Sequence, residues 1–529
     1  MEHIERNRKI IKSTFAVAAP TLLSRILGYL RDMIQAFYLG TSGSMDAFSI
    51  AYIIPNLLRR LTAEGAMTAA FVPVFTQLKK DKSREELWKF ANAFFFDLTL
   101  IIVLLAVLGI VFSPLLVKII AFGFKGAQGK WELTIILTKI MFPYICLISL
   151  AALAGAVLNS FYKFFVPAFT PVLFNLAIVS GALLFARKAE EPAFVFAGGV
   201  VAGGIFQLAF QIPFLWRRGM RFKPMLSFSH PAIRKVTNLL IPGIFGAGIY
   251  QFNFAISRMM ASSLQEGSVS SLYYSSRIEE MTLGLFSVAL SIALLPTFSD
   301  LVAQGDIPGM KRTLIFSLKL IFLVTIPAMA GLLALSRPIV QVLFQRGVFN
   351  SQSTSMTSTC LLFFSFGLPF ISGIKILAPS FYSLKDTKTP VIVAIFVMIS
   401  YIFFSLILMK PLNVGGIASA LSLSSFLNFF LLFFLLERKI GRIEKRELIV
   451  SAVKSGLSAA LMGGFVWLLV ARSGFPRLAF SSQLGLLLSA IVLGMIIYFI
   501  LSLLLNREEL KHLREIFSRK RILAERGKE

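Results

Sequence analysis

Apolar segments of about 20 residues or more recur from one end of this sequence to the other. The hydrocarbon core of a bilayer is ~30 Å thick, and a helix needs about 20 apolar residues to cross it. About fourteen segments meet that requirement, at 12–39, 46–76, 90–113, 132–160, 165–186, 192–216, 236–262, 269–301, 313–335, 354–383, 390–409, 414–437, 448–471 and 482–506. Only 15% of the residues are charged, too few to cover a water-soluble globule, which carries roughly 25%. We therefore expect an all-α polytopic membrane protein with about fourteen transmembrane helices.

The charge distribution indicates how these helices are oriented. The net charge of +27 comes from 53 Lys and Arg against 26 Asp and Glu, and the basic residues concentrate in alternate connections. The richest are residues 79–89, 217–235, 438–446 and the tail from 507. Because cytoplasmic loops are enriched in Lys and Arg, we expect both termini to be cytoplasmic. The basic loops then contact membrane lipids, and no nucleic-acid partner is expected.

Motifs for enzyme chemistry are absent from the sequence. Cys146 and Cys360 lie far apart in apolar segments, and there is no HExxH motif, nucleophile elbow or phosphate-binding loop. We expect no catalytic residues and no cofactor, and the sequence leaves a metal site open. Pro20 and Arg25 interrupt the first apolar segment, which favours a retained helix over a cleaved signal peptide.

Matched prolines indicate an internal repeat. Pro20 and Pro73 in the first two segments correspond to Pro242 and Pro296 in the seventh and eighth. An offset of six spans keeps the membrane orientation, and parallel repeats of this kind are typical of transporters. We predict an N-terminal lobe, a basic cytoplasmic linker, a C-terminal lobe, two additional helices and a basic cytoplasmic tail, at residues 1–216, 217–235, 236–437, 448–506 and 507–529.

Six arginines lie inside predicted spans, and five of them, at 25, 31, 59, 60 and 277, lie near polar residues on their own helices or far from the ends of their spans. An arginine at the centre of a membrane helix costs about 2.5–3.5 kcal/mol, so these side chains must face a polar interior. Polar partners occur at helical spacing, as with Asn56, Arg60 and Glu64, and with Arg277 and Glu280.

Two interpretations of these charges remain open. They are either structural ion pairs that join helices, or an anion-binding cavity with arginine in excess. Arginine suits phosphate because its planar guanidinium binds two oxygens at once and stays charged. Lys139, Arg258 and Lys375 extend this cavity in one interpretation and not in the other.

At these residues the sequence resembles the MurJ/MviN family of bacterial lipid II flippases, within the larger group of multidrug and polysaccharide exporters. The matching segments are SRILGYLRD at 24–32, DAF at 46–48, PNLLRRLTAEGA at 55–66, AFVP at 70–73 and GSVSSLYYSSR at 267–277.

The resemblance implies two six-helix lobes around a central cationic cavity, plus two C-terminal helices that line a groove for a lipid tail. It implies that lipid II, an undecaprenyl-diphosphate disaccharide-pentapeptide, moves from the cytoplasmic to the outer leaflet of the inner membrane by alternating access. The residues implied to bind the diphosphate are Arg25, Arg31, Arg59 and Arg277. Those implied to support or gate the site are Asp32, Asp46, Asn56, Arg60, Glu64 and Glu280.

The resemblance also implies a monomer with cell-wall synthesis proteins as further partners. Three other functions fit parts of the pattern: export of another polyprenyl-diphosphate-linked glycan, export of cationic drugs by the same fold, and a scaffold for cell-wall enzymes that transports nothing. A cation exporter would need acidic residues where this sequence has arginines.

Overall fold

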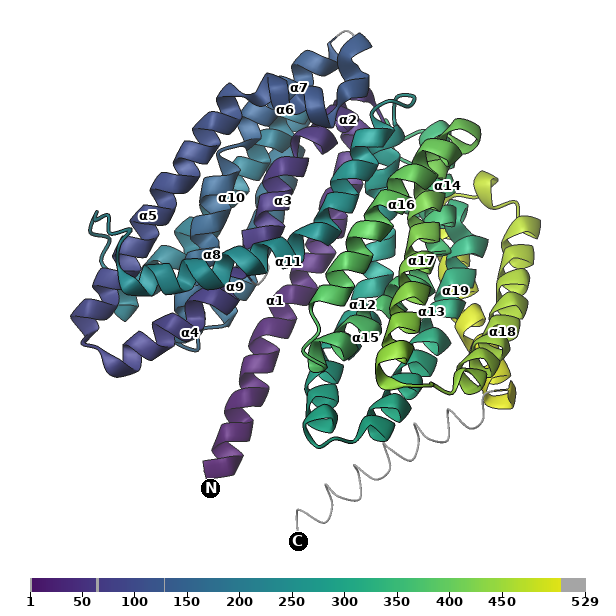
Figure 1. Cartoon of the computed structure of the whole chain (residues 1–529). Helices are drawn as coiled ribbons and strands as arrows, with labels where there is room; N and C mark the ends of the chain where they lie inside the picture. Colours follow the sequence, from purple (N-terminus) through teal and green to yellow (C-terminus); the bar gives the residue numbers. More distant parts are fainter. Residues whose placement is uncertain (1, 63–65, 128, 506–529) are drawn as a thin grey trace. The chain divides into compact units, whose positions relative to one another are not determined.

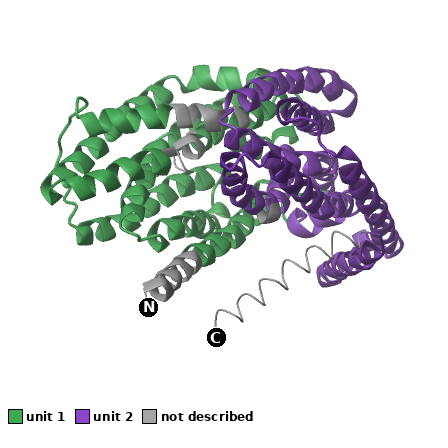
Figure 2. Cartoon of the chain, turned by 60° about the horizontal axis from the view of Figure 1, so that its bottom comes forward, with its two compact units in different colours: residues 1–270, 346–350 green, residues 271–345, 351–529 purple. Residues whose placement is uncertain are grey.

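The computed structural model describes residues 2–62, 66–127 and 129–505, without the side chains of 2–16, 58–62, 66, 242–250 and 284–286. Every regular element in the described ranges is helical (Figure 1). The chain forms two compact units, unit 1 with residues 1–270 and 346–350, and unit 2 with residues 271–345 and 351 onward (Figure 2). The expected all-α membrane protein is confirmed.

Unit 1 contains a long first helix, a segmented second span and seven further α-helices. The helices are α1 (Glu2–Leu39), α2 (Gly43–Ala51), α3 (Ile53–Thr62), α4 (Ala66–Asp81), α5 (Arg84–Val111), α6 (Ser113–Ile120), α7 (Lys130–Met141), α8 (Tyr144–Ser160), α9 (Phe165–Gly181), α10 (Pro192–Arg218) and α11 (Pro231–Ala261). Within this unit α10 packs against α8 and α9, α1 against α9, and α11 against α3 and α4.

Unit 2 contains the remaining helices. They are α12 (Ser268–Ala303), whose first turn belongs to unit 1, α13 (Ile307–Phe344), α14 (Ser351–Ser365), α15 (Leu368–Ser383), α16 (Lys388–Leu412), α17 (Val414–Ile440), α18 (Lys445–Arg472) and α19 (Phe480–Leu505). The helix α13 packs against α14, α15 and α18, while α17 packs against α14, α15 and α16.

Local sequence explains where several helices begin. Ser83 caps α5 by accepting a hydrogen bond from the Glu86 amide, and the Asp306 carboxylate accepts one from the Gly309 amide at the start of α13. Such side chains satisfy amides that have no partner within the helix. These caps fix the entry of the chain into two of its membrane helices.

Within 46–76, predicted as a single membrane-crossing segment, the helix is interrupted at Tyr52, between α2 and α3, and the described residues from Ala66 onward form α4. Pro73 lies inside α4, whereas Pro55 lies in the first turn of α3, where its missing amide hydrogen is compatible with a new helix that begins after Tyr52. The Tyr52 amide still bonds to the Phe48 carbonyl, which keeps the two short helices joined through a single turn.

Length and hydropathy alone support fewer than the predicted fourteen spans among the described residues. Nine described helices are long and apolar enough to cross a membrane, or eleven when two bent helix pairs count as one span each. One bent pair is α14 with α15, which meet at 45°. The total of fourteen stays a prediction.

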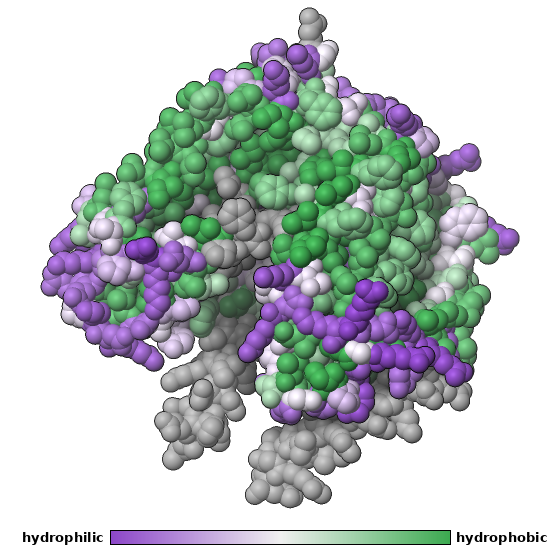
Figure 3. All heavy atoms as spheres, in the orientation of Figure 1, coloured by the Kyte–Doolittle hydropathy of each residue, from purple (hydrophilic) through white to green (hydrophobic). Residues whose placement is uncertain are grey.

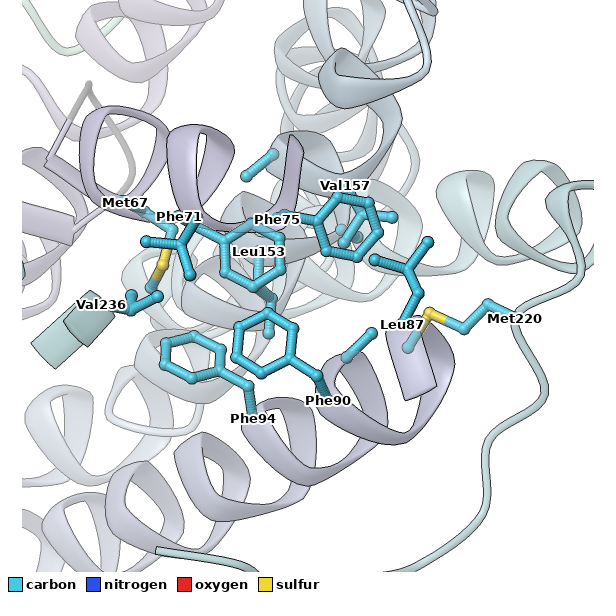
Figure 4. Packing of buried hydrophobic residues seen from close by; sticks show 14 of the residues in the cluster. Met67, Phe71, Phe75, Leu87, Phe90, Phe94, Leu153, Val157, Met220 and Val236 are labelled. Atoms are coloured by element: carbon cyan, nitrogen blue, oxygen red, sulfur yellow. The ribbon is translucent and has the colours of Figure 1, made fainter. Parts of the chain in front are cut away.

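The core of unit 1 is rich in phenylalanine. Phe71 of α4 stacks against Phe75 of the same helix and against Phe90 of α5, and Phe94 packs beside them (Figure 4). Met220 from the chain after α10 and Val236 of α11 belong to the same cluster. The basic segment 217–235 is therefore anchored to unit 1 through buried apolar side chains.

The lipid-facing surfaces carry large exposed apolar side chains. On α5 these include Leu104 and Val111, which are 58% and 63% exposed. Figure 3 shows green apolar residues on the faces of α16 and α17, with hydrophilic residues at the lower ends of the helices of unit 2. This pattern is that of a protein surrounded by hydrocarbon and bounded by polar interfaces.

Five residues between α13 and α14, residues 346–350, belong to unit 1 although unit 2 flanks them on both sides. The Val348 amide donates a hydrogen bond of 2.9 Å to the Phe37 carbonyl of α1. Gly347 has φ of +57°, and a Cβ there would lie 2.3 Å from the Phe37 carbonyl oxygen. Only glycine fits this approach, because it tolerates both the backbone conformation and the contact.

Candidate functional site

The predicted site residues are distributed over both units. Arg25, Arg31 and Asp32 lie in α1, Asp46 in α2, and Asn56, Arg59 and Arg60 in α3 of unit 1, while Arg277 and Glu280 lie in α12 of unit 2. Each unit can be described by its own contacts.

Arg31 is part of a buried polar network in unit 1. Its Nε and Nη2 donate to Asp32 Oδ1 at 3.1 and 2.8 Å, and its Nη1 donates to Asn175 Oδ1 of α9 at 3.1 Å. Arg31 is 8% exposed and Asp32 3%. Asn175 also donates through Nδ2 to the Ser24 carbonyl at 3.0 Å, so one amide fixes both the guanidinium and the helix that carries it. Sequence reasoning missed Asn175, which lies 144 residues from Arg31.

Arg25 differs from Arg31 in its surroundings. Its side chain is exposed and makes no hydrogen bond or ion pair with any described residue. The neighbouring Leu22 and Ile26 are 62% and 58% exposed. An uncompensated guanidinium in such an apolar segment requires water or an anion beside it, because hydrocarbon does not solvate it.

Asp46 has both carboxylate oxygens engaged. Oδ2 accepts from Lys130 Nζ at 2.7 Å and from the Gly267 amide at 2.9 Å. Oδ1 accepts from the Ser270 amide and from Ser270 Oγ, both at 2.8 Å. Asp46 is 1% exposed, and its charge lies at the N-terminus of α12, where the helix dipole favours an anion. Asp46 therefore joins α2, α7 and the start of α12, which leaves it no free oxygen for a ligand.

Two further contacts hold the loop between α11 and α12 in unit 1. The Gly43 amide donates to Glu266 Oε1 at 2.7 Å, and the Gly123 amide donates to Ser262 Oγ at 3.3 Å. A Cβ on Gly123 would lie 2.3 Å from the Ser262 carbonyl oxygen. The entrance to α12 is thus fixed by side chains and close backbone contacts from α2 and from the segment after α6.

The predicted polar stripe of the second span is only partly described. The Asn56 side chain is half-buried in α3. The side chains of Arg59 and Arg60 lie outside the described residues, as does all of Glu64.

In unit 2, Arg277 and Glu280 form an ion pair. Arg277 Nη1 donates to Glu280 Oε2 at 3.0 Å, one helical turn along α12. The guanidinium carbon lies 5.2 Å from the centre of the Tyr273 ring, within the range of a cation–π contact. The side chains of Arg277 and Glu280 are 24% and 32% exposed, so both keep part of their surface accessible.

A second pair of charges in unit 2 involves Glu279, which sequence reasoning missed. Glu279 is 4% exposed and interacts electrostatically with Lys375 of α15 and with Glu280. Adjacent residues on a helix point in different directions, so Glu279 lies off the face that Arg277 and Glu280 share. The sequence offered a signal for Glu279, because two consecutive glutamates follow Arg277 at 279 and 280. Only Glu280, one helical turn from Arg277, was assigned to the site.

The three other cations that the sequence analysis considered for the cavity differ in their exposure and in their neighbours. The Lys139 side chain is exposed and that of Arg258 is half-buried. Lys375 gains the acidic neighbour that the sequence had not assigned to it. Within the described ranges there is no group of three or more His, Cys, Asp or Glu side chains that could hold a metal ion.

Unit 2 also contains an apolar pocket of about 780 Å³. Its wall includes Phe322 of α13, Phe370 of α15, Phe426 and Phe429 of α17, and Leu448 of α18. The pocket is within the size range of small-ligand sites, roughly 300–1,000 Å³. Its lining carries no charged side chain, so it cannot be the site of anion recognition.

Known proteins provide an independent comparison. A family model described as "Lipid II flippase MurJ" matches residues 35–506. A Vibrio cholerae protein named "Probable lipid II flippase MurJ" is 35% identical over 518 residues, which covers 96% of this chain and 98% of that protein. A Burkholderia cenocepacia protein named "Lipid II flippase MurJ" is 33% identical over 434 residues, which covers 81% of this chain and 84% of that protein.

Solved structures give the same result. A structure titled "Lipid II flippase MurJ, inward closed conformation" has a TM-score of 0.76 and 28% identity, and covers 93% of this chain and 99% of that chain. An inward-facing MATE family transporter has a TM-score of 0.66 at 12% identity over 79% of this chain and 94% of that chain, a likeness of fold alone. Since the family model and relatives above 30% identity extend over most of the sequence, the chain belongs to the lipid II flippase MurJ family.

Proposed function

We propose that this protein moves lipid II from the cytoplasmic to the outer leaflet by alternating access, with Arg25, Arg31, Arg59 and Arg277 binding the diphosphate. The observation that carries the proposal is Arg25, an exposed guanidinium in an apolar segment without an ion pair to any described residue. A diphosphate is the anion that an arginine binds with two parallel hydrogen bonds.

The family consists of transporters rather than enzymes, and this chain is a multi-pass inner-membrane protein. Family membership supports lipid II as the substrate. The physical task is to move a polar head group through hydrocarbon, which it cannot cross unaided. A solvated cavity lined by arginines replaces the hydration of the diphosphate, while the polyprenyl chain remains in lipid.

The arginines differ in how firmly they are held. Arg31 is oriented by Asp32 and Asn175, and Arg277 is oriented by Glu280. Both guanidinium groups are therefore held in place before a ligand binds. These pairs also agree with the structural ion-pair interpretation for Arg31 and Arg277. Arg25 does not fit the structural ion-pair interpretation, because no acid neutralises it within the described part of the chain.

Asp46 is a gating residue in this proposal. It holds the start of α12 to α2 and α7 through four contacts, and alternating access requires such contacts to break and re-form. The proposal includes Asn56, Arg60 and Glu64 as supporting residues, cytoplasmic termini, and two six-helix lobes bounded at 1–216 and 236–437. It also includes a monomer that contacts cell-wall synthesis proteins.

The test is rescue of a bacterium whose own flippase is depleted, with lipid II in each leaflet as the readout. We expect Arg25→Ala to lose at least about tenfold in flipping, since a charge-assisted hydrogen bond contributes about 1.5–3 kcal/mol. Arg25→Lys keeps the charge but loses the paired geometry, so it should retain an intermediate rate. Arg187→Ala, an exposed arginine between α9 and α10, is the matched control. Flipping at the normal rate by Arg25→Ala would refute the proposed role of this residue.

A further inference from the structure

Glu279 is a buried acid without a hydrogen bond. It lies in α12 of unit 2, 4% exposed, and its Oε1 is fully buried without a donor. No ion pair within 4 Å joins Glu279 to any described residue. Most buried carboxylates are compensated by several donors, so this environment is exceptional.

The charged groups around Glu279 are few. Glu280 acts on it from the same helix and Lys375 from α15, and no titratable group of another described element does so. Lys375 is also without an ion pair among the described residues. A hydrogen bond of 2.9 Å between Ser287 and Ser372 holds α12 and α15 together. Glu279 and Lys375 are therefore opposite charges near one another but not in contact.

Glu279 and Glu280 of α12 both lie within one helical turn of Arg277. Arg277 neutralises Glu280 at 3.0 Å, and Glu280 is in turn adjacent to Glu279. A ligand anion on Arg277 adds negative charge to this group of side chains. An isolated ionised carboxylate in a low-dielectric interior is so costly that it takes up a proton instead.

We propose that Glu279 is a proton-binding site whose protonation is coupled to phosphate binding at Arg277. A proton from solvent adds to the carboxylate of Glu279, giving the neutral acid, and no other bond changes. Because the bound proton removes a negative charge close to the diphosphate, each ligand favours the binding of the other. This inference rests on the proposed function, since it requires Arg277 to bind the diphosphate.

The coupling predicts a pH-dependent affinity. At an effective dielectric constant of about 20, a second unit charge about 10 Å away changes affinity on the order of tenfold. Affinity for the diphosphate should therefore fall about tenfold as Glu279 loses its proton. Replacement of Glu279 by glutamine fixes the neutral state, so affinity should then be independent of pH.

The experiment uses the full chain in phospholipid nanodiscs with lipid II as the probe. Binding is measured by calorimetry from pH 6 to pH 9, in buffers with different ionisation enthalpies, which reports protons taken up per lipid bound. The wild type should take up protons, and Glu279→Gln should bind without uptake. The matched control is Glu132→Gln, an exposed acid on α7, which should behave as the wild type.

The outcomes separate this inference from the proposed function. If lipid II binds the wild type without proton uptake at any pH, the inference is overturned and the proposed function stands. If Glu279→Gln takes up as many protons as the wild type, the proton binds elsewhere and the inference is again overturned. If lipid II does not bind the wild type, the proposed function fails, and the inference fails with it.

Discussion

Asp46→Asn should loosen the loop that leads into α12. The aspartate is 1% exposed and accepts hydrogen bonds from Lys130, Gly267 and Ser270. Asparagine has nearly the same shape but no charge and only one acceptor oxygen. Removing one partner of a buried ion pair costs about 3–5 kcal/mol. Because every 1.4 kcal/mol is a factor of ten, local opening should become at least about 100-fold more frequent.

Hydrogen exchange measures this opening directly. The amides of Gly267 and Ser270 donate to the Asp46 carboxylate, so their exchange in the detergent-solubilised protein should accelerate by at least about 100-fold. Glu132→Gln, at an exposed position on α7, is the control and should leave both amides unchanged. Unchanged exchange in Asp46→Asn would mean that the carboxylate does not hold this loop, and the proposed gate would lose its basis.

A double-mutant cycle tests whether Lys130 acts through Asp46. Lys130→Met alone leaves the carboxylate buried without its cation, whereas the double variant removes both charges. The effects of the two substitutions on the free energy of opening should therefore fall short of additivity by at least about 1 kcal/mol. Additive effects would show that the 2.7 Å contact carries no coupling.

Asn175→Ala should slow flipping by about 10–100-fold, because Arg31 loses a hydrogen bond that orients its charged group, while Asn175→Asp keeps the acceptor and should retain more activity. Gly416→Ala should cost about 1–3 kcal/mol in thermal unfolding, since its Cβ would lie 2.1 Å from a backbone oxygen, whereas Gly464→Ala, with open space around it, should not destabilise the protein. Burial raises the pKa of Asp386, but hydrogen bonds from neighbouring side chains and an amide outweigh it and lower the pKa to about 2 from the ordinary 3.8. The contribution of Asp386 to the free energy of unfolding is therefore complete above about pH 4 and lost as the pH falls towards 2. Unfolding measured across this pH range should show the loss in the wild type and not in Asp386→Asn.

The positions of most helices could be predicted because membrane thickness imposes a local length requirement. The predicted segment 192–216 corresponds to α10 at Pro192–Arg218, and 414–437 to α17 at Val414–Ile440. The interruption of the helix within 46–76 could not be predicted in the same way. The available signal for the interruption at Tyr52 was Pro55, which lies in the first turn of α3 and has no amide hydrogen to donate to the preceding turn.

The candidate site could be predicted only where partners lie on one helix. Arg277 and Glu280 are one turn apart, and they are in contact. Helical spacing does not predict that Asp32 contacts Arg31, because adjacent residues on a helix point in different directions. Asn175 and Lys130 reach their partners from distant segments of the sequence, which periodicity does not detect.

The chain passes between the two units at three places, after residues 270, 345 and 350. Two of these crossings bound the short insertion that rests on the end of α1 through Val348 and Gly347. These five residues follow α13 and precede α14 in the chain, and the hydrogen bond from Val348 to Phe37 attaches them to the end of α1 within unit 1. A larger residue in place of Gly347 would collide with the Phe37 carbonyl and break this attachment.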